Sequence, residues 1–219
     1  MISIIKDESF AARNIPFGIA EVHFPERESW DENAFRVLAE EELSACRSCY
    51  PEYDRKSVFG DNPYFRFFKK FKKTYLVMLQ AESVLFKGRS FPADNPVTAI
   101  PFLLELCTFV LSGTHDVDQM DGPLTLFTPG AKFPFVGLRG DKVHTYPKDI
   151  CGSDNSGINL SMNAGADERT CARPDSRHVF YPVFGTPDTT DEWIHTNLER
   201  LESYIKVIAP EAVIEKTVV

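Results

Sequence analysis

The hydrophobic pattern changes along this 219-residue chain, and that change limits the folds it can adopt more than any other feature. Apolar residues follow helical spacing over much of the first half, whereas residues 124–184 contain short β-prone segments separated by Gly, Pro, Asn and Asp clusters. A helical pattern returns after residue 189. Because helices precede strands instead of alternating with them, we predict an α+β fold with helices packed against a sheet. No internal repeat or linker divides the chain, so residues 1–219 are expected to form a single domain.

Three segments carry helix signals at their ends. The first helix is expected to follow Asp31 and to end near Pro51. The second begins at Asn95, which can accept an amide hydrogen bond and is followed by a proline suited to the first turn, and it is expected to close at Gly113. The third starts from a cap within residues 189–192 and ends at Pro210.

The two ends of the chain have strand-like patterns. Residues 1–27 are expected to form one or two short strands around a turn at Pro16, Phe17 and Gly18. Residues 212–219 are expected to add a last strand to the sheet.

Residues 64–75 carry two stripes that we expect to share one helix. An aromatic stripe has i, i+3, i+4, i+7 and i+11 spacing, and a basic stripe repeats part of this spacing on another face. The aromatic stripe is Tyr64, Phe67, Phe68, Phe71 and Tyr75. Helical aromatic spacing favours a core role over base stacking. The basic residues are either a solvated face or contacts to RNA phosphates, and they are Arg66, Lys69, Lys70 and Lys73, joined nearby by Lys87 and Arg89.

Composition excludes several classes of function. The net charge of −8 and pI of about 5.2 are wrong for a protein that holds nucleic acid by general electrostatics, so any RNA contact must be local and no DNA binding is expected. Five cysteines, including the Cys46-x-x-Cys49 pair without a partner pair, predict neither disulfides nor a metal site. No nucleotide-binding or zinc-protease motif occurs, and no cofactor is expected. Without a membrane-length apolar run or a secretory start, we expect a cytoplasmic protein that binds no membrane.

One stretch, residues 62–122, resembles the B3/B4 domain of the beta subunit of phenylalanyl-tRNA synthetase and its free-standing bacterial relatives. The matching landmarks are Gln80-Ala81-Glu82-Ser83, Asn95-Pro96 and the segment DVDQMDG at residues 116–122. The segment HVFYPVF at residues 178–184 is similar to the family's following buried strand. The likeness covers about residues 18–209. It implies mixed β-sheet layers with helices packed on one side.

In the synthetase this domain hydrolyses the ester bond that joins a wrong amino acid to tRNA. The resemblance therefore implies that this chain binds tRNA or aminoacyl-tRNA and hydrolyses a mischarged species in trans. It implies no complete tRNA ligase. The synthetase's editing histidine falls on Gly113 here and its glutamate on Pro182. The alternative function is a non-catalytic module that binds an amino-acid-like ligand or a protein partner.

Polar residues near the matching segments are the candidates for a site. His115 and Asp116 are catalytic candidates, although a solvated turn explains the pair equally well. The substrate-binding candidates are Asn95, Asp154, Asn155, Arg169 and Arg173. The two arginines could hold a carboxylate or phosphate, or form surface ion pairs, and the aspartate and second asparagine could simply build a turn.

Overall fold

A four-stranded antiparallel sheet lies at the centre of the computed structural model, which describes residues 1–219. Its strands, in spatial order, are β11 (Val213–Val218), β2 (Phe17–His23), β10 (His178–Phe184) and β3 (His115–Asp116). Six of the seven residues of β2 are buried, because both faces of this strand are covered. The register pairs Phe17 with Phe184 and His23 with His178.

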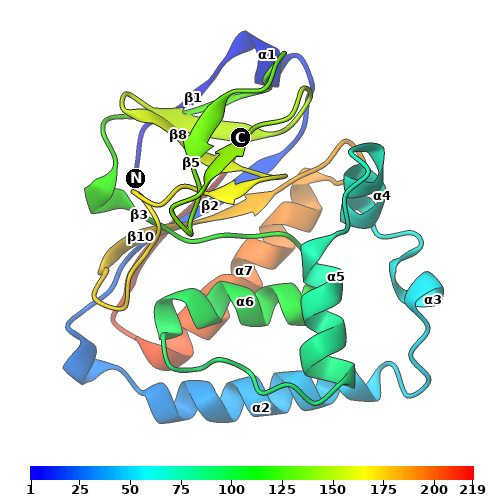
Figure 1. Cartoon of the computed structure of the whole chain (residues 1–219). Coiled ribbons are helices and arrows are strands. Elements are labelled where there is room, and N and C mark those ends of the chain that lie inside the picture. The colour runs from blue at the N-terminus through cyan, green and yellow to red at the C-terminus, as the bar shows by residue number, and fades with distance from the viewer.

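Helices cover one face of this sheet (Figure 1). They are α2 (Glu32–Ser48), α5 (Leu76–Ala81), α6 (Pro96–Thr108) and α7 (Asp191–Ile208). Helix α7 packs so closely on β2 that a Cβ atom at Gly18 would lie 2.4 Å from the Ile194 side chain. The hydroxyl of Tyr181 in β10 donates to the Val97 carbonyl oxygen of α6 at 3.0 Å. Both contacts fix the helical layer against the sheet.

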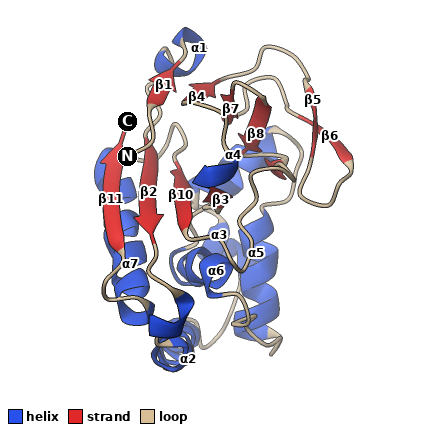
Figure 2. Cartoon of the chain, turned by 90° about the vertical axis from the view of Figure 1, so that its left-hand side faces the viewer, coloured by secondary structure: helices blue, strands red, loops and turns tan.

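A second sheet of five strands lies beyond the first, away from α2 and α6 (Figure 2). Its spatial order is β1 (Ile4–Lys6), β4 (Leu124–Phe127), β7 (Cys151–Asp154), β8 (Gly157–Ser161) and β9 (Gly165–Ala166). A separate hairpin pairs β5 (Pro134–Val136) with β6 (Lys142–His144). The short helices are α1 (Glu8–Ala11), η1 (Arg27–Ser29), α3 (Arg55–Phe59), α4 (Pro63–Lys70), η2 (Glu82–Phe86) and η3 (Val117–Gln119). The α+β prediction, with sheet layers and helices on one side, is confirmed.

One hydrophobic core of 48 buried residues runs through these layers. The predicted caps are observed for two helices, because the Asp31 side chain accepts from Ala34 N and the Thr190 side chain accepts from Trp193 N. The predicted final strand is β11. None of the helices is long and apolar enough to cross a membrane.

The prediction of one helix over residues 64–75 is wrong. Helix α4 ends at Lys70, Lys72 has a positive φ of 56°, and Tyr75 becomes the N-cap of α5. The reversal lets the Tyr75 ring stack on Tyr64, with ring centroids 5.7 Å apart. Both rings are fully buried, Phe67 and Phe68 are buried as well, and Phe71 is partly buried against the core, so the predicted core role of the aromatic stripe is confirmed.

Two further local predictions are wrong. Helix α6 ends at Thr108, before Gly113, because Phe109 takes the left-handed conformation and its carbonyl oxygen accepts hydrogen bonds from Asn62 Nδ2 (3.3 Å) and the Tyr75 hydroxyl (2.9 Å). At the other end of α6, the Asn95 side chain caps no backbone amide.

The turn predicted at residues 16–18 is also wrong, since Phe17 and Gly18 already belong to β2. Phe17 contacts Phe10 and Phe184 edge to face, so the core holds this residue in an extended strand.

Candidate functional site

A cavity of 460 Å³ lies between α5, α6, the segment that follows α6, and the turn between β8 and β9. We call it the Glu105 pocket. Its walls combine apolar side chains with polar ones, including Lys73, Gln80, Glu105 and Asn163, and with Gly113. A few converging polar groups in a concave, partly apolar site are typical of small-ligand binding.

Glu105 is the most unusual group of this pocket. Its Oε1 accepts hydrogen bonds from Ser112 N at 2.9 Å and from Ser112 Oγ at 3.2 Å, and no cation pairs with it. Burial raises the pKa of this carboxyl to about 8, and the two Ser112 hydrogen bonds offset only part of that rise. The side chain is therefore mainly protonated near neutral pH and can donate one hydrogen bond as well as accept others.

Two other polar residues of the wall have unused hydrogen-bond acceptors. The amide oxygens of Gln80 and Asn163 are buried and have no partner. Lys73 Nζ donates to the backbone oxygen of Asn163 at 2.6 Å and lies 4.1 Å from the centroid of the Tyr146 ring. Buried polar atoms normally have partners, so this wall favours a ligand that brings N–H or O–H donors.

A larger groove of 760 Å³ adjoins the Glu105 pocket along α5 and α6. The two hollows share lining residues, among them Leu76, Gln80 and Phe102. The groove extends to Arg89 and Asn95. Together they can accept a ligand longer than a free amino acid.

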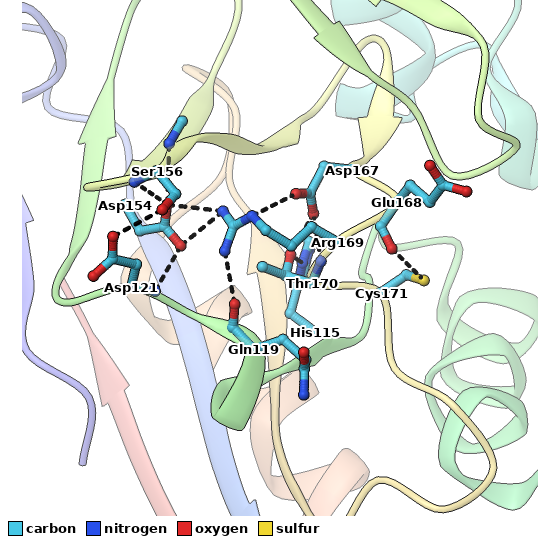
Figure 3. Close-up of polar contacts among 11 residues, drawn as sticks. His115, Gln119, Asp121, Asp154, Ser156, Asp167, Glu168, Arg169, Thr170 and Cys171 are labelled. Carbon is cyan, nitrogen blue, oxygen red and sulfur yellow. Dashed lines mark hydrogen bonds and ion pairs between the residues drawn. The ribbon is translucent and has the colours of Figure 1, made fainter.

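A chain of polar contacts joins Arg169 and its neighbours to His115 (Figure 3). Arg169 donates to both carboxylate oxygens of Asp154 at 2.8 Å, and its Nε lies 3.7 Å from Asp167 Oδ2. Asp167 Oδ1 accepts from the hydroxyl of Thr170, and Thr170 Oγ1 lies 2.9 Å from His115 Nδ1. The chain thus links Asp154 to His115 through three residues.

The hydrogen bonds of this chain assign the His115 tautomer. The Thr170 hydroxyl proton is directed at Asp167, so Thr170 Oγ1 accepts from an N–H at His115 Nδ1. Burial lowers the pKa of His115 to about 3, which keeps the ring neutral. Nε2 is then left with a free lone pair.

The Nε2 side of His115 faces Gly113. A Cβ atom built on Gly113 would lie 3.9 Å from His115 Nε2 and 3.3 Å from Pro182 Cγ. Gly113 also lines the Glu105 pocket. Gly113 and Pro182 are therefore neighbours, and both lie beside His115 at the edge of the pocket.

The structure brings some of the predicted site residues together and separates others. His115, Asp154 and Arg169 belong to the contact chain, and Asn155 follows in the turn after β7. Exposed Arg173 lines a shallow hollow of 570 Å³ beside Arg169.

Asp116 and Asn95 lie apart from this chain. Asp116 is buried in β3 and accepts from Ser176 Oγ and from Asp118 N. Asn95 lies in the groove, and its amide oxygen has no partner.

The basic residues predicted to contact RNA also lie in different surroundings. Lys73 is a pocket residue, Arg66 lies 3.6 Å from Asp188, and Lys87 lies 3.6 Å from Glu82. Lys69, Lys70 and Arg89 form no ion pair.

Lys70 borders a hollow of 320 Å³ with Arg13 and Lys148, two cations that the sequence pattern did not single out. Glu105, Gln80 and Asn163 were also missed. Glu105 left a signal as the single acidic residue in the apolar run IPFLLELC, and Gln80 belongs to the landmark Gln80-Ala81-Glu82-Ser83.

In sequence, the chain matches no protein-family model and no curated protein. In structure, it is similar to an N-terminal fragment of the phenylalanyl-tRNA synthetase beta-subunit from Pyrococcus horikoshii. The TM-score is 0.50 at 12% sequence identity, over 97% of this chain and 50% of that fragment. The chain therefore spans about half of the fragment's length and has a related fold.

Proposed function

We propose that this protein is a relative of the synthetase B3/B4 domain that binds aminoacyl-tRNA and hydrolyses a mischarged species in trans. The observation that carries the proposal is the place of Gly113. By the sequence resemblance, this residue stands where the synthetase has its editing histidine, and it lines the Glu105 pocket. The related fold supports the same reading.

The pocket suits the amino-acid end of such a substrate. An α-ammonium group supplies the N–H donors that the buried amide oxygens of Gln80 and Asn163 lack. The protonated Glu105 carboxyl is a hydrogen-bond donor for an ester or side-chain oxygen. The adjoining groove, with Asn95 and Arg89 along it, receives the terminal nucleotide.

His115 is the residue that would activate water. Its neutral Nε2 accepts a proton from a water molecule held beside Gly113, while Thr170 and Asp167 fix the ring. The water oxygen bonds to the ester carbonyl carbon. The bond from that carbon to the ribose oxygen then breaks, and the ribose oxygen takes the proton. The products are the free amino acid and uncharged tRNA.

Within the basic cluster predicted from the sequence, only some cations are free to contact the phosphates of the tRNA. Lys69, Lys70 and Arg89 form no ion pair, and Lys70 shares a basic hollow with Arg13 and Lys148. These residues, more than Arg66, Lys73 or Lys87, are proposed to contact RNA.

The test is deacylation of a panel of correctly and incorrectly charged aminoacyl-tRNAs by the purified protein. We expect selective hydrolysis of one mischarged species, a loss on the order of 100-fold in His115→Gln, and a smaller loss in Thr170→Val. His144→Gln, at an exposed position on β6, is the matched control and keeps full activity. Hydrolysis that His115→Gln leaves unchanged would contradict the proposed chemistry.

A second candidate is a non-catalytic module that binds an amino-acid-like ligand in the same pocket. It is favoured by Pro182, which stands in the place of the synthetase glutamate, and by the low pKa of His115, which makes this ring a weak base. Binding of aminoacyl-tRNA or amino acid amides without hydrolysis across the panel would select this candidate. Loss of that binding in Glu105→Ala, but not in His144→Gln, would locate it.

A further inference from the structure

Two histidines and a glutamate converge at the other end of β10, away from the Glu105 pocket. His178 Nε2 lies 2.8 Å from Glu21 Oε1, and His23 Nε2 lies 3.9 Å from the same oxygen. One ligand atom from each of the three residues falls within 4.8 Å of the other two. Small side-chain movements would bring the three ligand atoms close enough to bind one metal ion.

Strand register explains why these residues meet although 157 positions separate Glu21 from His178. Glu21 and His23 are two positions apart in β2, so their side chains project from the same face. His178 pairs directly with His23 across β2 and β10, and their rings stack with centroids 3.8 Å apart. The convergence is therefore fixed by two adjacent strands of the central sheet.

The surroundings of this cluster hold two of its members in place. Asp118 Oδ1, from η3, lies 3.1 Å from His178 Nδ1, on the side of the ring opposite Glu21. A carboxylate on the far nitrogen is the arrangement that orients metal-binding histidines. Glu21 is 3% exposed, and its other oxygen accepts from Ile2 N and lies 3.8 Å from the amino group of Met1.

We propose that Glu21, His23 and His178 form a zinc site, with Asp118 as the positioning residue of His178. Imidazole and carboxylate ligands are the donor set of zinc sites that have three protein ligands and one open position. His178 and Glu21 are preset, whereas the side chain of His23 is 55% exposed and free to turn. Zinc binding unstacks the two rings, because a metal ion must lie in the plane of each ring that binds it.

The proposal does not depend on the proposed deacylase function. Three residues of β10 lie between His178 and Pro182, which is the neighbour of the pocket residue Gly113, so the two positions are roughly 13 Å apart along the strand. The zinc site is therefore a separate site on the same sheet. Its open coordination position faces away from α7, which covers the opposite face of β2.

The test is titration of the chelator-treated protein with zinc by calorimetry, and with cobalt by visible absorption. We expect one zinc ion per chain and cobalt bands of a low-symmetry site with nitrogen and oxygen ligands. His23→Ala and His178→Ala each weaken binding by at least the order of 100-fold, and Asp118→Asn weakens it about 10- to 100-fold. His195→Ala, an exposed histidine on α7, is the matched control and leaves binding unchanged.

His23→Ala is the decisive variant, because an exposed side chain can be removed without loss of the fold, which circular dichroism would check. No zinc uptake by the wild-type protein would overturn the proposal. So would uptake that His23→Ala and His195→Ala reduce equally, since that result would show scattered binding by surface histidines.

Discussion

Glu105 makes the stability of the protein depend on pH, and Glu105→Gln should remove that dependence. The carboxyl is buried without a cation, and its pKa is raised from an ordinary 4.5 to about 8. At about 1.4 kcal/mol for each pKa unit, the shift corresponds to roughly 5 kcal/mol of folding free energy. Glutamine is close in size and keeps an oxygen to accept from Ser112, but it carries no titrating proton.

The sign follows from which state holds the proton. Between pH 4.5 and 8 the folded state keeps the Glu105 proton and the unfolded state has lost it. The stabilisation is therefore complete below pH 4.5 and is lost as pH rises towards 8. Between pH 4.5 and pH 7, ionisation of Glu105 in the unfolded state lowers the free energy of unfolding of the wild type by roughly 3 kcal/mol. Glu105→Gln has no such loss and should therefore be more stable than the wild type at pH 7.

The assay is urea unfolding of the wild type and Glu105→Gln at several pH values from 5 to 8. The difference between their free energies of unfolding should grow by about 1.4 kcal/mol for each pH unit, because all other titrating groups are common to both. Glu41→Gln, at an exposed position on α2, is the control and should run parallel to the wild type. Parallel curves for Glu105→Gln would refute a neutral buried carboxyl.

Three further substitutions test an ion pair, a close backbone contact and a left-handed backbone conformation, each by urea unfolding. Arg169→Met should cost about 2 kcal/mol, because it leaves the fully buried Asp154 carboxylate without its cation; a change below about 0.5 kcal/mol would contradict this. Gly185→Ala should cost about 3 kcal/mol, since the new Cβ would lie 2.0 Å from the Pro16 carbonyl oxygen, and an unchanged midpoint would show that the backbone yields. Lys72→Gly should stabilise by about 0.5–1 kcal/mol by relieving the positive φ of 56°, whereas any loss would point to a role for the side chain.

Hydrophobic spacing predicted the large elements of this fold because packing follows it directly. The helix after Asp31 and the helix after Thr190 begin at their capping residues, and the last strand pairs with β2 as expected. The helix ends at Lys70 and Thr108 were missed for a different reason. Lys72 and Phe109 adopt left-handed conformations that neither residue type favours. At Lys72 the backbone closes the end of α4 with local hydrogen bonds from Lys72 N to Lys69 O and from Lys73 N to Phe68 O. At Phe109 the tertiary hydrogen bond from the Tyr75 hydroxyl to the Phe109 carbonyl oxygen stabilises the break.

The candidate site was harder to predict because its residues come from distant elements. His115 stood out by its place after a helix, but its partner Thr170 is 55 positions away and carries no recognisable motif. Glu105 could have been noticed as an acid in an apolar helix. The zinc ligands depend on the register between β2 and β10, which the sequence does not specify on its own.

The cluster of positive charge in the sequence overstated what the surface offers to RNA. Of the six basic residues predicted to contact RNA, Arg66 and Lys87 have acidic neighbours and Lys73 contacts Asn163 and Tyr146. The five cations proposed to contact RNA, Lys69, Lys70, Arg89, Arg13 and Lys148, would give a salt slope of about 3.5 in magnitude for a single strand, which is well short of the steep dependence of a protein held mainly by phosphates. Affinity for an aminoacyl-tRNA must then come mostly from the Glu105 pocket and its groove. A ligand that fills only the pocket, such as an amino acid amide, should therefore compete with the whole tRNA.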